Sequence, residues 1–296
     1  MSSIAFSANQ VHGKKSSRLR IWRSRFSTAV VLFLLLFFSA VFLIPFLWLF
    51  ITAIKPIDDM SAFPVLLWPS HPAWDNFVLA TTLINFWNFA GNSFLLATIQ
   101  SVLVTITSAM VGFAFARLQG VGKNLLFMIM LATLMLPAIV ATIPTYVIFS
   151  RLGLIGNYWP WVIWGLASSP FLNFLFRQFF STIPVELEEA ALMDGCSYWR
   201  IFWQIFLPLS GPVIATSLIL SFSAVWGDWL TPELFLSSDN TTLGVALSTG
   251  YTDAHGITLN NVLAAGCILY IIPMLVLFFA AQRYFTRGIV MSGLRG

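Results

Sequence analysis

Long apolar stretches separated by short polar segments dominate this chain of 296 residues. A helix needs roughly 20 residues to cross about 30 Å of hydrocarbon, and six stretches are long enough. They are residues 26–54, 89–116, 125–149, 158–180, 207–235 and 262–284. The apolar runs are continuous and do not alternate with polar residues, as the strands of a membrane barrel would. The pattern therefore predicts an all-α membrane protein with six transmembrane helices.

Composition supports a membrane location and also indicates the orientation. Hydrophobic residues make up 58% of the chain and charged residues only 9%, against about 25% charged residues in soluble domains. Lys and Arg are enriched in cytoplasmic loops. With six spans, only Lys55 and Arg151 fall on one side, which leaves 13 of the 15 basic residues on the other. We therefore expect both termini on the cytoplasmic side, and we interpret the net charge of +4 as a topology signal and not as a sign of nucleic-acid binding.

The same pattern gives the expected organisation of the chain. Residues 1–25 form a cytoplasmic N-terminal tail, and 26–54 form the first span. Residues 55–88 contain four prolines and three tryptophans, which suits an outer loop at the headgroup level. Residues 89–285 hold the other five spans, and 286–296 form a cytoplasmic C-terminal tail.

The third predicted span contains two prolines, Pro137 and Pro144. Proline removes a backbone donor and kinks or breaks a helix. In a transporter, such a break often lines a path through the protein. The other interpretation is a tolerated kink packed against neighbouring helices, and the sequence leaves both open.

A polar, acidic segment at 181–208 interrupts the apolar pattern. Its charges indicate that it lies outside the hydrocarbon. Pro184 suits the first turn of a helix, Gly195 suits a helix end, and Ser197 suits the cap of a second helix. The segment therefore predicts two short helices joined by a glycine turn. We expect this loop to contact another protein.

The two faces of this loop differ in the size of their side chains. The small Ala190 and Ala191 allow another surface to approach closely, whereas four bulky aromatic residues are expected to pack beneath the bundle: Trp199, Phe202, Trp203 and Phe206. An alternative is a pair of amphipathic helices adsorbed on the membrane. Such helices prefer Lys and Arg on their polar face, whereas this loop is acidic.

The loop also resembles a known motif. The spacing of Glu189-Ala190-Ala191, Gly195 and Leu207-Pro208 matches the EAA motif of ABC importer membrane subunits. The segments LPAIVATIPTY (136–146) and FRQFFSTIPVELEEAA (176–191) resemble the sugar-importer branch, and the ending AQRYFTRGIVMSGLRG resembles the MalG-type subunit of maltose transporters. The resemblance covers roughly residues 85–296 and implies the type I ABC importer permease (MetI-like) fold.

The resemblance implies a permease subunit of an ATP-driven, binding-protein-dependent importer of a sugar or oligosaccharide in the bacterial inner membrane. It implies a second, MalF-like permease subunit, an ABC ATPase dimer, an extracytoplasmic solute-binding protein and membrane lipid as partners, and no nucleic acid. The residues expected to couple to the ATPase are Glu188, Glu189, Ala190, Ala191, Asp194, Gly195 and Ser197.

The sequence lacks the motifs of the common enzyme classes. It contains neither the phosphate-cradling loop G-x-x-x-x-G-K-[ST] nor an HExxH, CxxC or GxSxG motif. We therefore expect no enzymatic activity, no metal and no cofactor of its own, with ATP bound by the partner ATPase.

Four polar residues within or beside the spans are candidates for the substrate path: Asp228, Asn92, Thr142 and Asn173. An acidic residue close to hydrocarbon is a candidate functional residue, so Asp228 either hydrogen-bonds a sugar in the translocation cavity or lies in water at the interface. Sugar-importer subunits often have Trp-Asn before this position, whereas this chain has Trp226-Gly227.

Three alternative functions stay open at this stage. The first is the same machinery serving another solute, such as a glycerol-phosphate compound, an amino acid or a polyamine. An ion-coupled secondary transporter is less consistent, because the chain shows no clear internal repeat and few charges at the membrane midplane. A membrane enzyme needs convergent catalytic groups, and the chain has only three histidines.

Overall fold

The structure is a computed structural model that describes the backbone of residues 5–253 and 255–293 and the side chains of residues 28–137, 139–253 and 255–282. The described chain is helical, and its one β-bridge joins Thr252 to Thr258. The predicted all-α class is confirmed. The basic N-terminal cluster and the C-terminal tail 286–296 lie outside the residues whose side chains are described.

The elements follow one another along the chain as short and long helices. They are α1 (Ala5–Ala53), α2 (Ile57–Met60), α3 (Asp75–Thr82), α4 (Phe86–Arg117), α5 (Lys123–Ala132), η1 (Thr133–Met135), α6 (Ala138–Arg151), α7 (Trp159–Leu166), α8 (Pro170–Ser181), α9 (Val185–Met193), α10 (Tyr198–Ile201), the π-helix η2 (Phe202–Phe206), α11 (Leu207–Leu209), α12 (Gly211–Trp226), α13 (Leu230–Phe235), α14 (Leu243–Thr249) and α15 (Asn260–Gly293).

Three single helices in the described chain are long and apolar enough to cross a membrane: α1 from Thr28, α4, and α15 as far as Gln282. Two bent pairs raise the number to five, if α5–η1 with α6 and α10–α11 with α12 each count as one span. The six predicted stretches are therefore not six continuous helices. Helix α1 begins at Ala5, so regular structure extends through most of the expected tail 1–25.

Prolines explain why two of the predicted spans are divided. The proline ring disfavours the helical region for the residue before it. Leu136 before Pro137 and Ser169 before Pro170 are accordingly both extended. The predicted span 158–180 is therefore two helices, α7 and α8, and the third span is broken at Pro137. Pro144 lies inside α6 without ending it.

The predicted span 207–235 is also divided. Helix α11 ends at Leu209, and α12 turns away from it by 81° at Ser210. Helix α12 then ends at Trp226, and α13 starts at Leu230 after a short break. Asp228 lies in that break and accepts a hydrogen bond from the Thr231 N–H at 3.1 Å.

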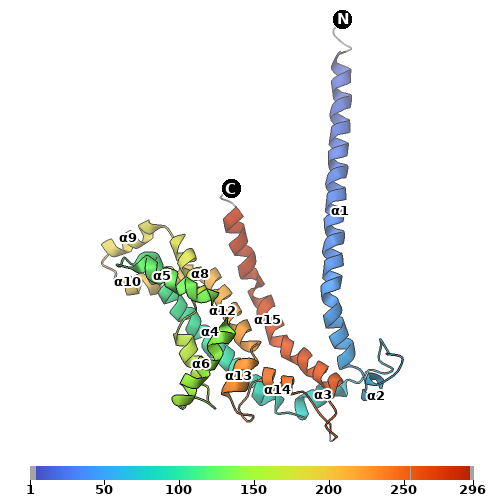
Figure 1. Ribbon diagram of the computed structural model, residues 1–296. Coiled ribbons are helices and arrows are strands. Elements are labelled where there is room, and N and C mark those ends of the chain that lie inside the picture. The colour runs from blue at the N-terminus through green and yellow to red at the C-terminus, as the bar shows by residue number, and fades with distance from the viewer. Residues whose placement is uncertain (1–4, 254, 294–296) are drawn as a thin grey trace.

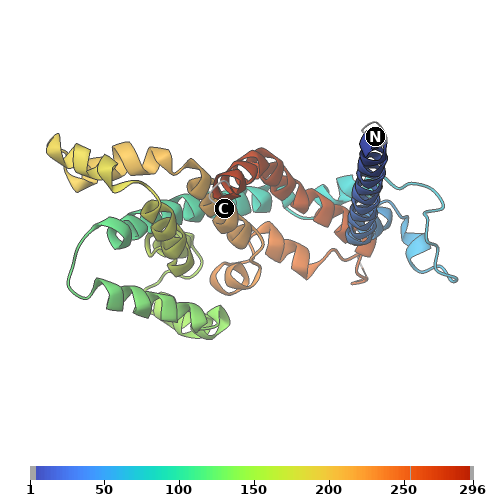
Figure 2. The same ribbon diagram turned by 90° about the horizontal axis from the view of Figure 1, so that it is seen from above.

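Helix α4 is the centre of the molecule (Figures 1 and 2). Helices α7, α8 and α12 pack against it, and α15 packs against α12 and α1. A buried hydrogen bond of 2.8 Å between the Thr105 and Ser217 hydroxyls joins α4 to α12. A Cβ atom added at Gly112 would lie only 2.5 Å from the Phe176 Cβ, so α4 and α8 are in backbone contact there.

We expect Gly112→Val to destabilise the fold by about 1–3 kcal/mol, because the added side chain forces α4 and α8 apart. The matched control is Gly91→Val in the same helix, where an added Cβ has open space. The measurement is the midpoint of thermal unfolding of the purified protein in detergent. Equal midpoints for the two variants would show that the helices do not approach closely at Gly112.

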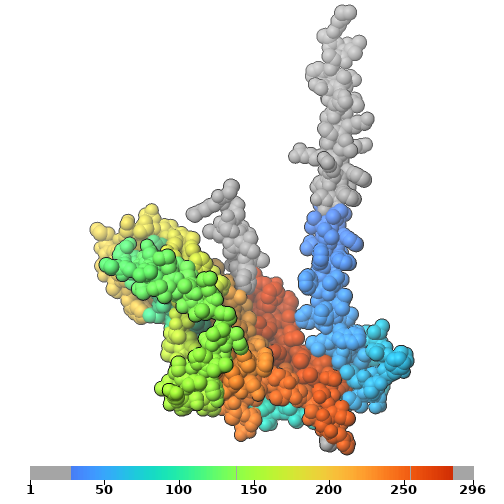
Figure 3. Space-filling view, in the orientation of Figure 1, coloured from blue at the N-terminus to red at the C-terminus, as the bar shows by residue number. Residues whose placement is uncertain are grey.

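Two asparagines attach α1 to the rest of the molecule. Asn76 Nδ2 donates to the Ala53 and Lys55 carbonyls at 2.8 and 2.9 Å, and Asn261 Nδ2 donates to the Lys55 carbonyl at 3.0 Å. Above this junction α1 stands apart from the bundle (Figure 3), and the apolar side chains of its described part are exposed. Within its described residues, α1 therefore leaves a wide apolar surface for lipid or protein.

The predicted outer loop 55–88 contains two short helices, α2 and α3. The loop is held together by Asp59, whose carboxylate accepts hydrogen bonds from the Ser70 N–H at 2.7 Å and the Ser70 hydroxyl at 3.0 Å. The hydrogen bond from the Ser70 backbone is the main reason why the pKa of Asp59 is lowered. The loop is therefore an ordered structure at the same end of the molecule as α14.

Candidate functional site

The acidic segment 181–208 forms the predicted pair of short helices, α9 and α10, at the end of the molecule where the C-terminal part of α15 also lies (Figure 1). Pro184 occupies the cap position before α9, one residue earlier than predicted. The chain continues from α10 through one π-helical turn, η2, into α11. The loop is thus a compact elbow between α8 and α12.

The turn between α9 and α10 has the expected geometry. Gly195 has a φ of +80°, a conformation that favours glycine because it lacks a Cβ. Its N–H bonds to the Leu192 carbonyl, and the next N–H, of Cys196, bonds to the Ala191 carbonyl. Ser197 then caps α10, with its hydroxyl oxygen accepting from the Arg200 N–H at 3.4 Å. The predicted roles of Gly195 and Ser197 in the local fold are confirmed.

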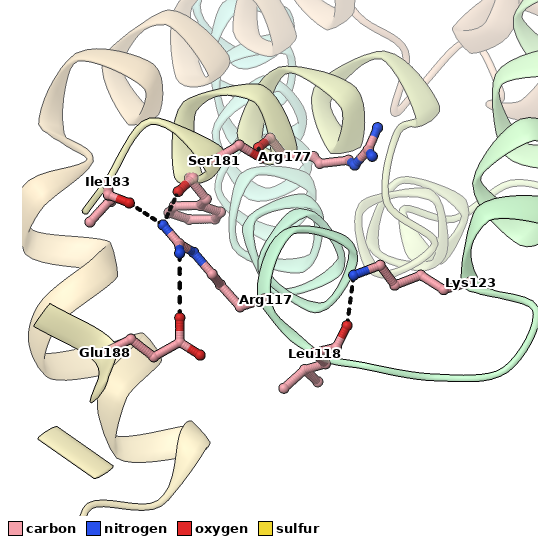
Figure 4. Close-up of polar contacts among 8 residues, drawn as sticks. Arg117, Leu118, Lys123, Arg177, Ser181, Ile183 and Glu188 are labelled. Carbon is pink, nitrogen blue, oxygen red and sulfur yellow. Dashed lines mark hydrogen bonds and ion pairs between the residues drawn. The ribbon is translucent and has the colours of Figure 1, made fainter. Parts of the chain in front are cut away.

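Arg117, at the end of α4, holds the elbow from inside (Figure 4). One guanidinium nitrogen donates to the Phe180 carbonyl at 2.6 Å and to the Ile183 carbonyl. The other lies 3.5 Å from the Glu188 carboxylate, and the guanidinium carbon lies 5.0 Å from the centre of the Phe206 ring. One side chain therefore binds the end of α8, helix α9 and the π-helical turn together.

The Arg117 contacts change the interpretation of two predicted coupling residues. Glu188 and Ala191 are only 6% and 7% exposed and face the bundle. Glu188 holds the elbow through its ion pair with Arg117, and Ala191 packs in the apolar core beneath the elbow. Glu189, Ala190, Asp194, Gly195 and Ser197 are exposed.

Aromatic residues pack between the elbow and the bundle. Phe202 and Phe206 are buried as predicted, and the ring centre of Phe113 on α4 lies 5.4 and 4.9 Å from theirs. Trp199 and Trp203 are 60% and 38% exposed, so the prediction that they pack beneath the bundle was wrong. The reason is that the face of the π-helical turn that meets α4 is filled by the two phenylalanines.

The exposed surface of the elbow is both acidic and apolar. Met193 is 89% exposed, and Trp199 adds a large exposed ring. The carboxylates of Glu189 and Asp194 lie on exposed residues of the same elbow. The periodicity of α9 suggested a small alanine surface but gave no sign of the exposed Met193, the last residue of the helix. The Arg117 contacts also escaped the sequence analysis, although the residue ends an apolar span.

The structure places the four candidate path residues in different surroundings. Asn92 donates to the Thr241 carbonyl at 3.0 Å. Asn173 is buried and donates to the Ser168 hydroxyl at 3.1 Å, and Thr142 is half-buried on α6. Asp228 lines a cavity with a volume of about 230 Å³. Asn92 and Asn173 therefore bond to other parts of the protein, whereas Asp228 borders a cavity.

The described residues contain no group of three or more His, Cys, Asp and Glu side chains that could hold a metal ion. The elbow contains one free thiol, that of the half-buried Cys196. The elbow presents an exposed surface that Arg117 fixes to the helices behind it.

Comparison with known proteins identifies the family. Residues 108–291 match the family described as "Binding-protein-dependent transport system inner membrane component". The chain belongs to this family. It is therefore a transport permease of the ABC type, a membrane component that is not itself an enzyme.

Curated relatives match this permease over most of their length. It is 32% identical over 289 residues to the arabinooligosaccharides transport system permease protein AraQ of Halalkalibacterium halodurans, with 96% of this chain and 99% of that protein covered. It is 34% identical over 267 residues to the sn-glycerol-3-phosphate transport system permease protein UgpE of Salmonella typhi, with 86% and 92% covered.

Solved structures confirm the fold. A bacterial ABC transporter involved in the import of the acidic polysaccharide alginate matches with a TM-score of 0.76 at 23% identity, covering 88% of this chain and 97% of that one. The inward-facing MetNI methionine ABC transporter matches with a TM-score of 0.51 at 16% identity, covering 67% and 93%. The predicted MetI-like permease fold is therefore correct.

Proposed function

We propose that this permease forms half of the translocation pathway of an ATP-driven, binding-protein-dependent importer of a sugar or oligosaccharide. The observation that carries the proposal is the elbow 181–208, which exposes a contact surface and is bound internally to α4 through Arg117. A surface fixed in this way transfers a push or pull from a partner to the helices behind it. Membership of the family supports the same role.

The partner at the elbow is an ABC ATPase dimer. ATP binding closes the ATPase dimer, and the elbow moves with the ATPase surface that it contacts. Glu189, Asp194 and Ser197 are available for polar contacts, and Met193 for an apolar one. Because Gly195 and Ser197 fix the angle between α9 and α10, the elbow moves as one piece. ATP stays on the partner, so the permease needs no cofactor of its own.

The other expected partners are a second permease subunit and a binding protein, because one chain provides only half of the translocation pathway. A single chain of this fold provides one half, so a second, MalF-like permease subunit completes it, and an extracytoplasmic binding protein delivers the solute at the end that carries α3 and α14. In this orientation the elbow and both termini lie on the cytoplasmic side of a bacterial inner membrane. Its exposed apolar surfaces, such as that of α1, contact lipid or the second subunit.

A sugar is favoured as the solute by the arabinooligosaccharide permease among the relatives, whereas the UgpE match supports a glycerol-phosphate compound. Uptake by the complete transporter, reconstituted with its ATPase and binding protein, separates the two. We expect ATP-dependent uptake of labelled arabinotriose or another neutral oligosaccharide, and little uptake of sn-glycerol 3-phosphate.

The controls for this experiment test the energy source. Omitting ATP or the ATPase is expected to stop uptake, and an ionophore that collapses the ion gradients is expected to leave it unchanged. Uptake that continues without the ATPase and stops with the ionophore would contradict the proposal and support an ion-coupled transporter. Uptake of sn-glycerol 3-phosphate alone would leave the proposed ATP-driven importer in place, but the solute would be a glycerol-phosphate compound and not a sugar.

A further inference from the structure

A small cavity lies where α4, α7 and α12 meet, under the turn that leads into α13. Its polar lining residues are Gln100, Asp228 and Thr231, and its walls include Trp161 and Trp164. The volume of about 230 Å³ is below the roughly 300–1,000 Å³ usual for drug-sized ligands. A space of this size suits a single sugar ring.

The polar groups of this cavity are left open to a ligand. In the part of the chain that the structure describes, the Gln100 amide has no hydrogen-bond partner, and neither has the indole N–H of Trp161 or Trp164. The Asp228 carboxylate uses one oxygen, Oδ1, to accept from the Thr231 N–H at 3.1 Å, and its second oxygen has no described partner. Several donors and an acceptor therefore line one cavity, and no hydrogen bond between them is found among the described residues.

The two indoles are held rigidly. Their ring centres are 5.6 Å apart in an edge-on arrangement, and Trp164 also packs edge-on against Phe235 with ring centres 5.2 Å apart. Aromatic side chains present an apolar body together with a polar N–H. A sugar ring has apolar C–H faces and a rim of hydroxyl groups, which is the complementary arrangement.

The charge of the cavity selects among sugars. Asp228 is the only charged residue in its described lining, and no Lys or Arg faces it there. A phosphate or uronate group would meet this carboxylate without a compensating cation, and like charges at short range repel strongly in a partly buried site. The lining therefore disfavours anionic solutes and accepts neutral ones.

We propose that this cavity is a binding subsite for one ring of an uncharged sugar on its way through the permease. The ring packs against the indole of Trp164, its hydroxyl groups donate to the Asp228 carboxylate, and its oxygens accept from the Gln100 amide. The inference rests on the proposed function and adds to it the solute class, a neutral sugar, and the residues that select it.

A protection experiment tests the subsite directly. Ala224 lines the cavity with a small exposed side chain, so Ala224→Cys, in a background where Cys196 and Cys267 are replaced by alanine, provides a thiol inside it. The measurement is the rate of maleimide labelling of the complete transporter in detergent. We expect millimolar arabinotriose or maltotriose to slow labelling at least several-fold, and the anionic trigalacturonate to leave it unchanged.

The matched control is Ser248→Cys in the same background. Ser248 is exposed and lines a different cavity, between the α12–α13 break, α14 and α15. Its labelling rate is expected to be the same with and without each sugar. Protection at both positions would indicate a general conformational change and would overturn the subsite.

Two substitutions test the assigned roles. Gln100→Leu and Asp228→Asn are expected to raise the KM for neutral sugar uptake at least about 10-fold. Asparagine also caps a helix turn, so Asp228→Asn keeps the local fold. Because this variant lacks the carboxylate charge, the transporter's preference for arabinotriose over trigalacturonate is expected to become smaller.

The outcomes separate this inference from the proposed function. If sugar uptake is ATP-dependent but neither neutral sugar protects Ala224→Cys, the subsite is wrong and the importer assignment stands. If trigalacturonate protects better than the neutral sugars, the charge selection is wrong. If the complete transporter takes up no sugar, the proposed function itself fails.

Discussion

Replacing Arg117 by alanine is expected to abolish solute uptake. The substitution leaves the buried Glu188 carboxylate and the Phe180 and Ile183 carbonyls without their shared donor. Removing one partner of a buried ion pair costs about 3–5 kcal/mol. Because the lost contacts join the elbow to α4, we expect uptake to fall at least about 100-fold, measured in proteoliposomes that contain the complete transporter.

Two comparison variants separate coupling from folding. Arg117→Ala combined with Glu188→Ala removes the orphaned carboxylate, so its unfolding midpoint should recover while uptake stays low. Lys123→Ala removes another basic residue from the same region, one that donates only to the Leu118 carbonyl, and it should transport almost normally. Wild-type uptake by Arg117→Ala would refute the role of Arg117.

Replacing Gly195 by valine is expected to prevent the ATPase from binding while the permease still inserts into the membrane. Gly195 has a φ of +80°, and a β-branched residue in that region costs about 1–3 kcal/mol. The elbow relieves this strain by changing the angle between α9 and α10, which displaces its exposed surface. The measurement is the amount of ATPase that copurifies with the membrane subunits.

Asparagine provides the matched control at this position, because it tolerates the left-handed conformation better than other non-glycine residues. Gly195→Asn should therefore retain most ATPase binding and uptake. An added Cβ meets no atom within 4 Å there, so a steric clash within the permease does not explain a difference between the two variants. Normal copurification with Gly195→Val would contradict the assignment of the elbow.

The local structure of the elbow could be predicted from the sequence because its signals are local. Gly195 and Ser197 each act on backbone groups within a few residues, and both have the predicted roles. The continuity of the spans was harder to predict, because the hydrophobic pattern does not show where a helix breaks inside an apolar stretch. Hydrophobicity alone joined α7 to α8, and the extended Ser169 before Pro170 divides them.

The contacts between distant segments could not be predicted from one sequence. Arg117 meets Glu188 across 71 positions of sequence, and no periodic pattern connects two residues at the ends of different helices. Which side chains face the bundle was also uncertain, since Glu188 and Glu189 are identical in chemistry and differ only in which side of α9 they occupy. The cavity beside Asp228 depends on three helices meeting, which the order of residues does not reveal.

The most direct test of the coupling role is a photo-crosslink from the elbow. A photoreactive amino acid at Met193, which is 89% exposed, is compared with the same amino acid at Phe63, which is 96% exposed in the loop 55–88. We predict an adduct with the ATPase subunit from position 193 and none from position 63. An ATPase adduct from position 63 alone, or none from position 193 in an actively transporting complex, would contradict the account.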